Sequence, residues 1–189
     1  MSAAVLVTGI HREELGFGDR VAALVDPGQV EVLRIAHGIS NARTGTNEGF
    51  YRDTEHREIY LQLRQQIRQQ PQWRGVPLID LHAGVDEHGP CADIYSAHEP
   101  LLSCLDGRLH ADPRVRLVRI VDKPVAGSDS RPDALARTRI PRSLWDSRDW
   151  IYVGLEVYLA QPADGGPDDC DLATEIIGHI CRCTTATGR

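Results

Sequence analysis

The sequence lacks any apolar run close to the ~20 residues that a membrane span needs. It also lacks a block of basic residues: its 21 Lys and Arg residues are scattered, and the formal net charge is −6. Residues 1–4 carry no basic residue ahead of a short apolar run, so we expect a strand there rather than a signal peptide. These absences exclude a membrane protein, argue against a nucleic-acid partner and predict a cytoplasmic protein.

Cysteine is also scarce, with five residues in 189. Cys181 and Cys183 stand too close together for a zinc knuckle, and no second pair lies at a suitable spacing. We therefore expect reduced structural thiols. The length fits one domain covering residues 1–189, because a chain of this size buries roughly 70% of its unfolded surface.

Apolar segments alternate with segments of helical periodicity along the first half of the chain. The clearest helix is expected to be capped by Asp53 or Thr54, with Ile59, Leu63 and Ile67 on one face. The alternation predicts an α/β fold in which helices cover both faces of a largely parallel sheet. The expected strands cover residues 5–9, 30–36, 76–84, 92–96, 115–121 and 150–159, and further helices are expected around residues 21–25 and 172–180. Residues 122–149 show little periodicity and predict a long surface excursion, either a lid or a plain loop.

Two of these strands end in residues that can bind metal. The first breaks at Gly9 and is followed by His11 and Glu14, which share a face if a helix begins there. Another apolar run delivers His82 at its carboxyl end, where α/β sheets place their sites. Taken alone, His11 and Glu14 also fit an ordinary acidic helix start. Together the two stretches predict three ligands for one pocket.

A carboxylate interrupts the most hydrophobic strand. Glu156 lies in the middle of the segment 150–159, where an unpaired buried charge would cost several kcal/mol. We expect Glu156 to be partnered, protonated or directed into a pocket.

These residues resemble motifs of the zinc carboxypeptidase superfamily, especially its succinylglutamate desuccinylase and aspartoacylase branch. The segment from Gly9 to Glu14 resembles the Gly-x-His-x-x-Glu motif, Asp80-Leu81-His82 resembles the Asp-Leu-His motif, and Glu156 resembles the general-base glutamate. The resemblance covers residues 5–160 in outline. It implies a three-layer α/β/α sandwich around a mostly parallel mixed sheet, one zinc ion bound by His11, Glu14 and His82, and Glu156 as the catalytic base.

Two positions depart from the pattern of that family. Arg12 stands where a small residue usually follows the first ligand, and residues 51–57 replace the Asp-Leu-Asn-Arg stretch. The substrate-binding arginine is therefore assigned from position: Arg43 and Arg52 lie in the loop that leaves a strand end. Arg57 falls inside the expected helix, almost opposite its apolar stripe, and is expected to be solvated.

The resemblance implies a zinc-dependent hydrolase that cleaves an amide bond in a small, carboxylate-bearing substrate. Both an N-acyl amino acid deacylase and a carboxypeptidase acting on short peptides fit. We expect only the catalytic part of an aspartoacylase-like enzyme, without its extra β domain, so that residues 122–149 influence substrate choice. Asp80 is expected either to support the His82 ring or to be structural.

Two alternatives belong to other classes of protein. The first is a non-catalytic metal- or ligand-binding protein in which Arg12 blocks the pocket and Glu156 is a partnered carboxylate. The second, a nucleotide-binding domain, is disfavoured because the first turn has neither Gly-x-Gly-x-x-Gly nor a Lys-Ser/Thr phosphate loop. Three further histidines could be auxiliary ligands or substrate contacts, but we expect them to be ordinary surface or loop residues: His37, His88 and His98.

Overall fold

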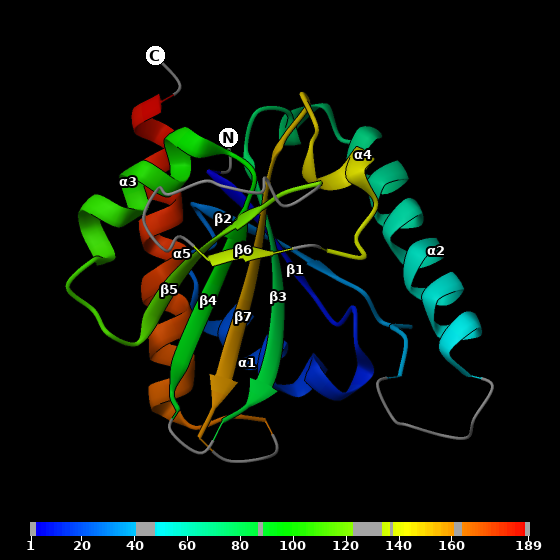
Figure 1. Cartoon of the computed structure of the whole chain (residues 1–189), viewed down its shortest axis with the longest axis horizontal. Coiled ribbons are helices and arrows are strands. Elements are labelled where there is room, and N and C mark those ends of the chain that lie inside the picture. The colour runs from blue at the N-terminus through cyan, green and yellow to red at the C-terminus, as the bar shows by residue number, and fades with distance from the viewer. Residues whose placement is uncertain are drawn as a thin grey trace.

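A computed structural model of the chain describes residues 3–40, 48–86, 89–122, 134–136, 138–160 and 164–187, without the side chains of residues 48–53, 134, 186 and 187. At its centre is a seven-stranded sheet of order β2-β1-β3-β7-β4-β5-β6 (Figure 1). The described pairings are all parallel except that of β7 with β4. The strands are β1 (Ala4–Thr8), β2 (Val30–Arg34), β3 (Pro77–Val85), β4 (Cys91–Ser96), β5 (Val115–Ile120), β6 (Ala134–Ala136) and β7 (Ile151–Leu159).

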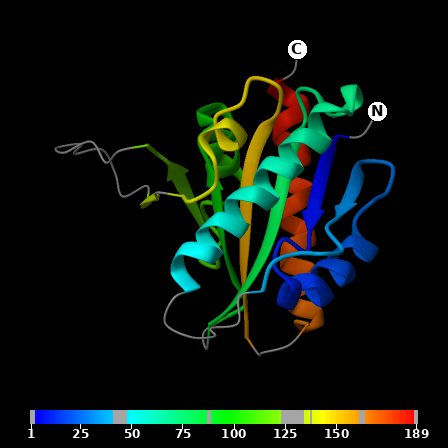
Figure 2. The same cartoon turned by 90° about the vertical axis from the view of Figure 1, so that its right-hand side faces the viewer.

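Helices cover both faces of this sheet. The elements are η1 (Arg12–Glu14), α1 (Leu15–Leu24), α2 (Glu48–Arg68), η2 (Pro71–Trp73), α3 (Glu99–Leu109), α4 (Arg142–Trp145) and α5 (Pro167–Thr187). Helices α1, α3 and α5 pack on one face, and α2 with α4 packs on the other (Figures 1 and 2). The expected three-layer α/β/α sandwich around a mostly parallel mixed sheet is thus confirmed. No helix in the described part of the chain has the length and hydropathy needed to span a membrane.

The core consists of two apolar clusters, one on each side of the sheet. Strand β1 contributes to both, because Ala4 and Leu6 belong to the cluster under α1 and α5, whereas Val5 and Val7 belong to the cluster under α2. Alternate side chains of a strand point to opposite faces, so a strand covered on both sides is apolar throughout. This explains why β1 carries no alternating pattern.

Helix α2 differs from the sequence-based expectation at its start. It begins at Glu48 rather than near Asp53 or Thr54, so Arg52 lies in the helix and not in a loop. After Gly49 no glycine or proline interrupts the segment before Pro71, and a polar residue inside a helix costs well under 1 kcal/mol. The predicted apolar stripe of Ile59, Leu63 and Ile67 is buried.

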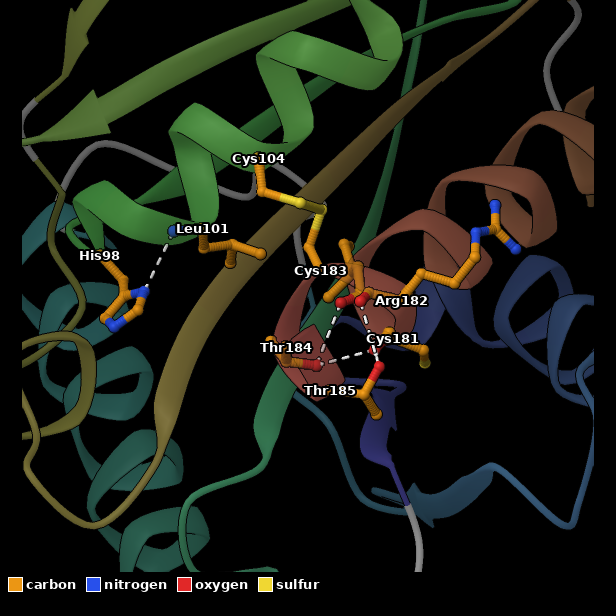
Figure 3. Close-up of a disulfide and its surroundings, with 9 residues drawn as sticks. His98, Leu101, Cys104, Cys181, Arg182, Cys183, Thr184 and Thr185 are labelled. Carbon is orange, nitrogen blue, oxygen red and sulfur yellow. Dashed lines mark hydrogen bonds between the residues drawn. A yellow bond between two sulfur atoms is a disulfide. The ribbon is translucent and has the colours of Figure 1, made fainter. Parts of the chain in front are cut away.

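A disulfide joins α3 to α5, which contradicts the expectation that all thiols are reduced. Cys104 and Cys183 are bonded across adjacent helices, with their Cα atoms 5.8 Å apart (Figure 3). The two cysteines are 79 residues apart in the sequence. They meet because α3 and α5 pack together, and no local sequence pattern indicates which helices are neighbours. Three cysteines are free: Cys91, Cys170 and Cys181.

Candidate metal centre and active site

A glycine turn at the end of β1 delivers His11. Gly9 has φ of +81°, and a Cβ there would lie 2.6 Å from the carbonyl oxygen of Ile35, so a larger residue would be both strained and blocked. His11 then adopts an extended conformation and forms a bridge with Ile39. The short helix η1 follows at once, and its single turn brings Glu14 back beside His11.

Glu14 contacts both histidines of the predicted ligand set. Its Oε1 lies 2.8 Å from Nδ1 of His11, and its Oε2 lies 3.0 Å from Nδ1 of His82. One ligand atom from each residue falls within 4.8 Å of the others. The three side chains are only 12%, 9% and 11% exposed, so the cluster is largely shielded from water. The structure thus brings His11, Glu14 and His82 together.

Asp80 holds the far side of the His82 ring. Its carboxylate is fully buried and accepts hydrogen bonds of 2.8 Å from the hydroxyls of both Tyr60 and Tyr152. Nε2 of His82 lies 3.2 Å from Oδ2 of Asp80 and 3.1 Å from the Tyr60 oxygen. These neighbours place a proton on Nε2 and fix the ring orientation, as carboxylates behind metal-binding histidines commonly do. Of the two roles predicted for Asp80, support of His82 is the one that this geometry matches.

The chemistry of the donor set fits a metal cation. Nδ1 of each histidine faces a carboxylate oxygen of Glu14, and two lone pairs at that distance require a proton or a metal ion between them. Burial lowers the pKa of His82, but Asp80 and Glu14 outweigh it and hold the pKa well above the usual value. Two imidazole nitrogens and one carboxylate are a donor set that catalytic zinc sites use, with the fourth position of the ion left open.

Glu156 reaches the same pocket from β7. Strand β7 pairs in parallel with β3, and Glu156 is the register partner of His82. A Cβ at Gly84 would lie 3.3 Å from Oε1 of Glu156, so this glycine leaves room for the carboxylate. Burial raises the pKa of Glu156 above its ordinary value; nearby Glu14 adds to the effect, whereas His82 opposes it. Of the three environments expected for this residue, the structure provides the pocket.

A cavity of about 380 Å³ opens over these groups. Its wall includes Thr138, Arg139 and Ile140, which belong to the predicted excursion, and that excursion also contains β6 and α4. The lining consists of His11, His56, Tyr60, His82, Tyr95, Ile120, Ala136, Thr138, Arg139, Ile140, Tyr152, Gly154, Leu155 and Glu156.

The predicted substrate-binding arginines do not lie in a described loop at this cavity. Arg43 falls outside the described residues, and Arg52 lies in α2, in the stretch whose side chains are not described. Arg57 is exposed on α2, as expected. Nε of Arg12 donates a 2.8 Å hydrogen bond to the carbonyl of Gly38, and Arg12 is not among the residues that line the cavity. In the described part of the chain, the arginine at the cavity is Arg139.

Sequence reasoning missed several of the cavity residues. Tyr152 shares a strand face with Glu156 and was detectable from the two-residue period of the strand. His56 and Tyr60 lie one helical turn apart on α2, but nothing in their spacing identifies the strand end that they face. Among the other histidines, His37 is exposed, His88 lies outside the described residues, and His98 caps α3.

No protein-family model matches the sequence, and a search of curated proteins found no match. Three solved structures are similar to this chain at a low level. Murine aminoacylase 3 has 13% sequence identity and a TM-score of 0.42, and the match covers 96% of this chain and 63% of that chain. The CwlD amidase from Clostridioides difficile, in complex with the GerS lipoprotein, has 13% identity and a TM-score of 0.43, and the match covers 96% of this chain and 93% of that chain. The catalytic domain of CwlV, an N-acetylmuramoyl-L-alanine amidase from Bacillus (Paenibacillus) polymyxa var. colistinus, has 10% identity and a TM-score of 0.44, and the match covers 99% of this chain and 98% of that chain. The chain spans less than two thirds of the aminoacylase 3 chain.

Proposed function

We propose that this protein is a zinc-dependent hydrolase that cleaves an amide bond in a small, carboxylate-bearing substrate, of the N-acyl amino acid deacylase or carboxypeptidase type. One observation carries the proposal: ligand atoms of His11, Glu14 and His82 lie within 4.8 Å of one another, and the two histidines line the same cavity as Glu156. The motif resemblance to the zinc carboxypeptidase superfamily supports the same assignment.

Zinc would be held by His11, Glu14 and His82. When bound, zinc supplies a Lewis acid that polarises a carbonyl group and lowers the pKa of water to about 7. The fully buried Asp80 keeps Nδ1 of His82 directed at the ligand cluster, because it engages Nε2 of the same ring.

Glu156 would serve as the general base. It accepts a proton from the water that attacks the amide carbon, and it returns that proton to the nitrogen as the C–N bond breaks. A carboxylate whose pKa is raised by burial suits this task, because a base works best when its pKa lies closer to the working pH.

An arginine would bind the substrate carboxylate through charge-assisted hydrogen bonds. Arg139 is our first candidate because it lines the cavity. Arg43 and Arg52 remain candidates on the sequence argument. Arg12 hydrogen-bonds the carbonyl of Gly38, so it offers no support for the non-catalytic alternative in which it blocks the pocket.

Metal analysis and an activity screen test the proposal together. Protein purified without chelator should contain close to one zinc per chain and should hydrolyse members of a panel of N-acyl amino acids and short peptides. His82→Ala should lose the metal, whereas His110→Ala, at an exposed position, should retain it. Wild-type protein that cannot be loaded with zinc would overturn the proposal. Zinc-loaded protein that hydrolyses nothing on the panel would favour the binding-protein alternative.

A further inference from the structure

His56 is a cavity residue with no part in the metal cluster. It lines the cavity from α2, and its ring stacks on that of His11, with centroids 5.6 Å apart and an interplanar angle of 22°. Its edge packs against Tyr60, with centroids 4.9 Å apart. Among the described residues, the group close enough to share a metal consists of His11, Glu14 and His82, so His56 stands outside it.

The ring of His56 is held in place without a hydrogen bond to its Nδ1. This atom is sealed from solvent and has no hydrogen-bond partner among the described residues. Buried polar atoms without partners are rare in folded proteins, and each calls for an explanation. Packing between two aromatic rings explains the position of His56 but not the choice of histidine, since a phenylalanine would pack equally well.

The sealed nitrogen determines where the proton of the neutral ring resides. An N–H group at Nδ1 would be buried with no acceptor, which costs more than leaving a weak acceptor unpaired. The neutral ring therefore carries its proton on Nε2. His56 thus offers an N–H donor at the wall of the cavity.

Four side chains along the cavity follow one another in order. The ring of His56 stacks on His11, the ring of His11 lies 5.0 Å from that of His82, and His82 pairs in register with Glu156. His56 is therefore a neighbour of His11, whereas Glu156 is a neighbour of His82. With Glu156 beside His82 to take the proton of the attacking water, His56 beside His11 is available to act on the carbonyl oxygen of the substrate.

We propose that His56 is a further catalytic residue, whose Nε2–H donates a hydrogen bond to the amide carbonyl oxygen and to the oxyanion that forms from it. This role rests on the hydrolase function proposed above. When water adds to the amide carbon, the C=O π electrons move to oxygen, and a donor already in place stabilises that charge without reorganisation. A neutral imidazole can act in this way, because the ring donates a hydrogen bond and transfers no proton.

Substitution by phenylalanine separates this role from ring packing. His56→Phe keeps an aromatic ring between His11 and Tyr60 but removes the donor. We expect kcat/KM on the best substrate of the panel to fall roughly 100-fold, since loss of one oxyanion donor costs 100- to 1,000-fold. Zinc content and thermal unfolding should match wild type, and His110→Phe at an exposed site should change none of these values. A rate within threefold of wild type would leave only the packing role, and loss of zinc would make His56 a metal ligand; either result overturns the proposal.

A second measurement does not depend on turnover. In zinc-loaded wild-type protein labelled with ¹⁵N-histidine, NMR should show His56 neutral with its proton on Nε2, and this N–H resonance should shift when methylphosphonate, a tetrahedral oxyanion, binds. His56→Phe should bind methylphosphonate at least tenfold more weakly by calorimetry. An Nδ1–H tautomer would overturn the assignment even if the Phe variant fails to fold, because the tautomer is read in wild type. Equal affinity of the two folded proteins for methylphosphonate would also overturn it.

The two proposals fail in different ways. If zinc-loaded protein hydrolyses nothing but binds methylphosphonate through His56, the hydrolase function is overturned, and His56 stands as an oxyanion donor. If the protein hydrolyses the panel and the Phe variant is equally fast, the hydrolase function stands and the role of His56 is overturned.

Discussion

Nδ1 of His82 lies 3.0 Å from Oε2 of Glu14, a residue 68 positions earlier in the chain. The contact forms because β1 and β3 are adjacent and parallel, so that the turn after β1 and the later part of β3 come together. Because Asp80 and Tyr60 engage Nε2 of the same ring, Nδ1 is the nitrogen of His82 that faces Glu14. The chemistry of the site follows from this arrangement.

Replacement of Asp80 tests the support behind His82. Asp80→Asn preserves the volume of the side chain but removes the charge that raises the pKa of His82 and holds its ring. We expect zinc affinity to fall 10- to 100-fold, as is usual for a partner behind a metal-binding histidine. Competition with a chromophoric chelator measures this loss. Tyr152→Phe removes a hydrogen-bond donor to Asp80 but keeps the carboxylate, so it should lower zinc affinity less. Unchanged zinc affinity in Asp80→Asn would contradict the supporting role of Asp80.

Removal of the charge of Glu156 tests the catalytic base. Glu156→Gln should retain zinc and the thermal unfolding temperature of wild type, yet lose 100- to 10,000-fold in kcat, the usual contribution of a positioned base. Glu58→Gln, at an exposed position on α2, is the matched control and should keep full activity. If instead the wild-type protein hydrolyses nothing and Glu156→Gln lowers its stability, Glu156 is a structural partner on a buried strand.

The arginine that binds the substrate carboxylate can be identified by comparing variants. Arg139→Ala should lower kcat/KM while zinc stays bound. The loss should correspond to about 1.5–3 kcal/mol of transition-state free energy, the range for a lost hydrogen bond to a charged group. Arg57→Ala, which removes an exposed guanidinium from α2, should change little. Arg43→Ala and Arg52→Ala complete the comparison. A large loss in either of these, with none in Arg139→Ala, would return the role to the arginines predicted from sequence.

We expect His98 to make a pH-dependent contribution to the free energy of unfolding. Its Nδ1 accepts a hydrogen bond from the backbone N–H of Leu101 at the start of α3, and burial lowers its pKa below 6.5. Because the folded state disfavours protonation, this stability is fully present above the unfolded pKa of 6.5 and is lost as the pH falls below it. Urea unfolding at pH 7.5 should show a loss of about 1 kcal/mol in His98→Ala.

The asparagine variant supplies the control for His98. Asparagine also accepts the capping bond but does not titrate, so His98→Asn should match wild type at pH 7.5 and lose less stability than wild type at pH 5.5. Identical pH dependence of the two proteins would show that the cap of α3 does not respond to protonation.

Much of the layered fold was predictable because periodicity reports local burial. A strand covered on both faces is apolar at every position, as in β1, and a helix on one face buries every third or fourth residue, as Ile59, Leu63 and Ile67 do. Helix boundaries were less certain, because polar residues such as Asp53 are tolerated both in a loop and inside a helix. The start of α2 was therefore misplaced, and with it Arg52.

The sequence by itself determined the strand ends that present His11, Glu14 and His82, and the isolated carboxylate of Glu156, because these depend on local spacing alone. Only the tertiary structure decided that β7 inserts between β3 and β4 and places Glu156 beside His82. It also decided that α2 brings His56 to the cavity and that Cys104 meets Cys183. Strand order and helix docking depend on packing between segments far apart in the chain, which no local pattern records.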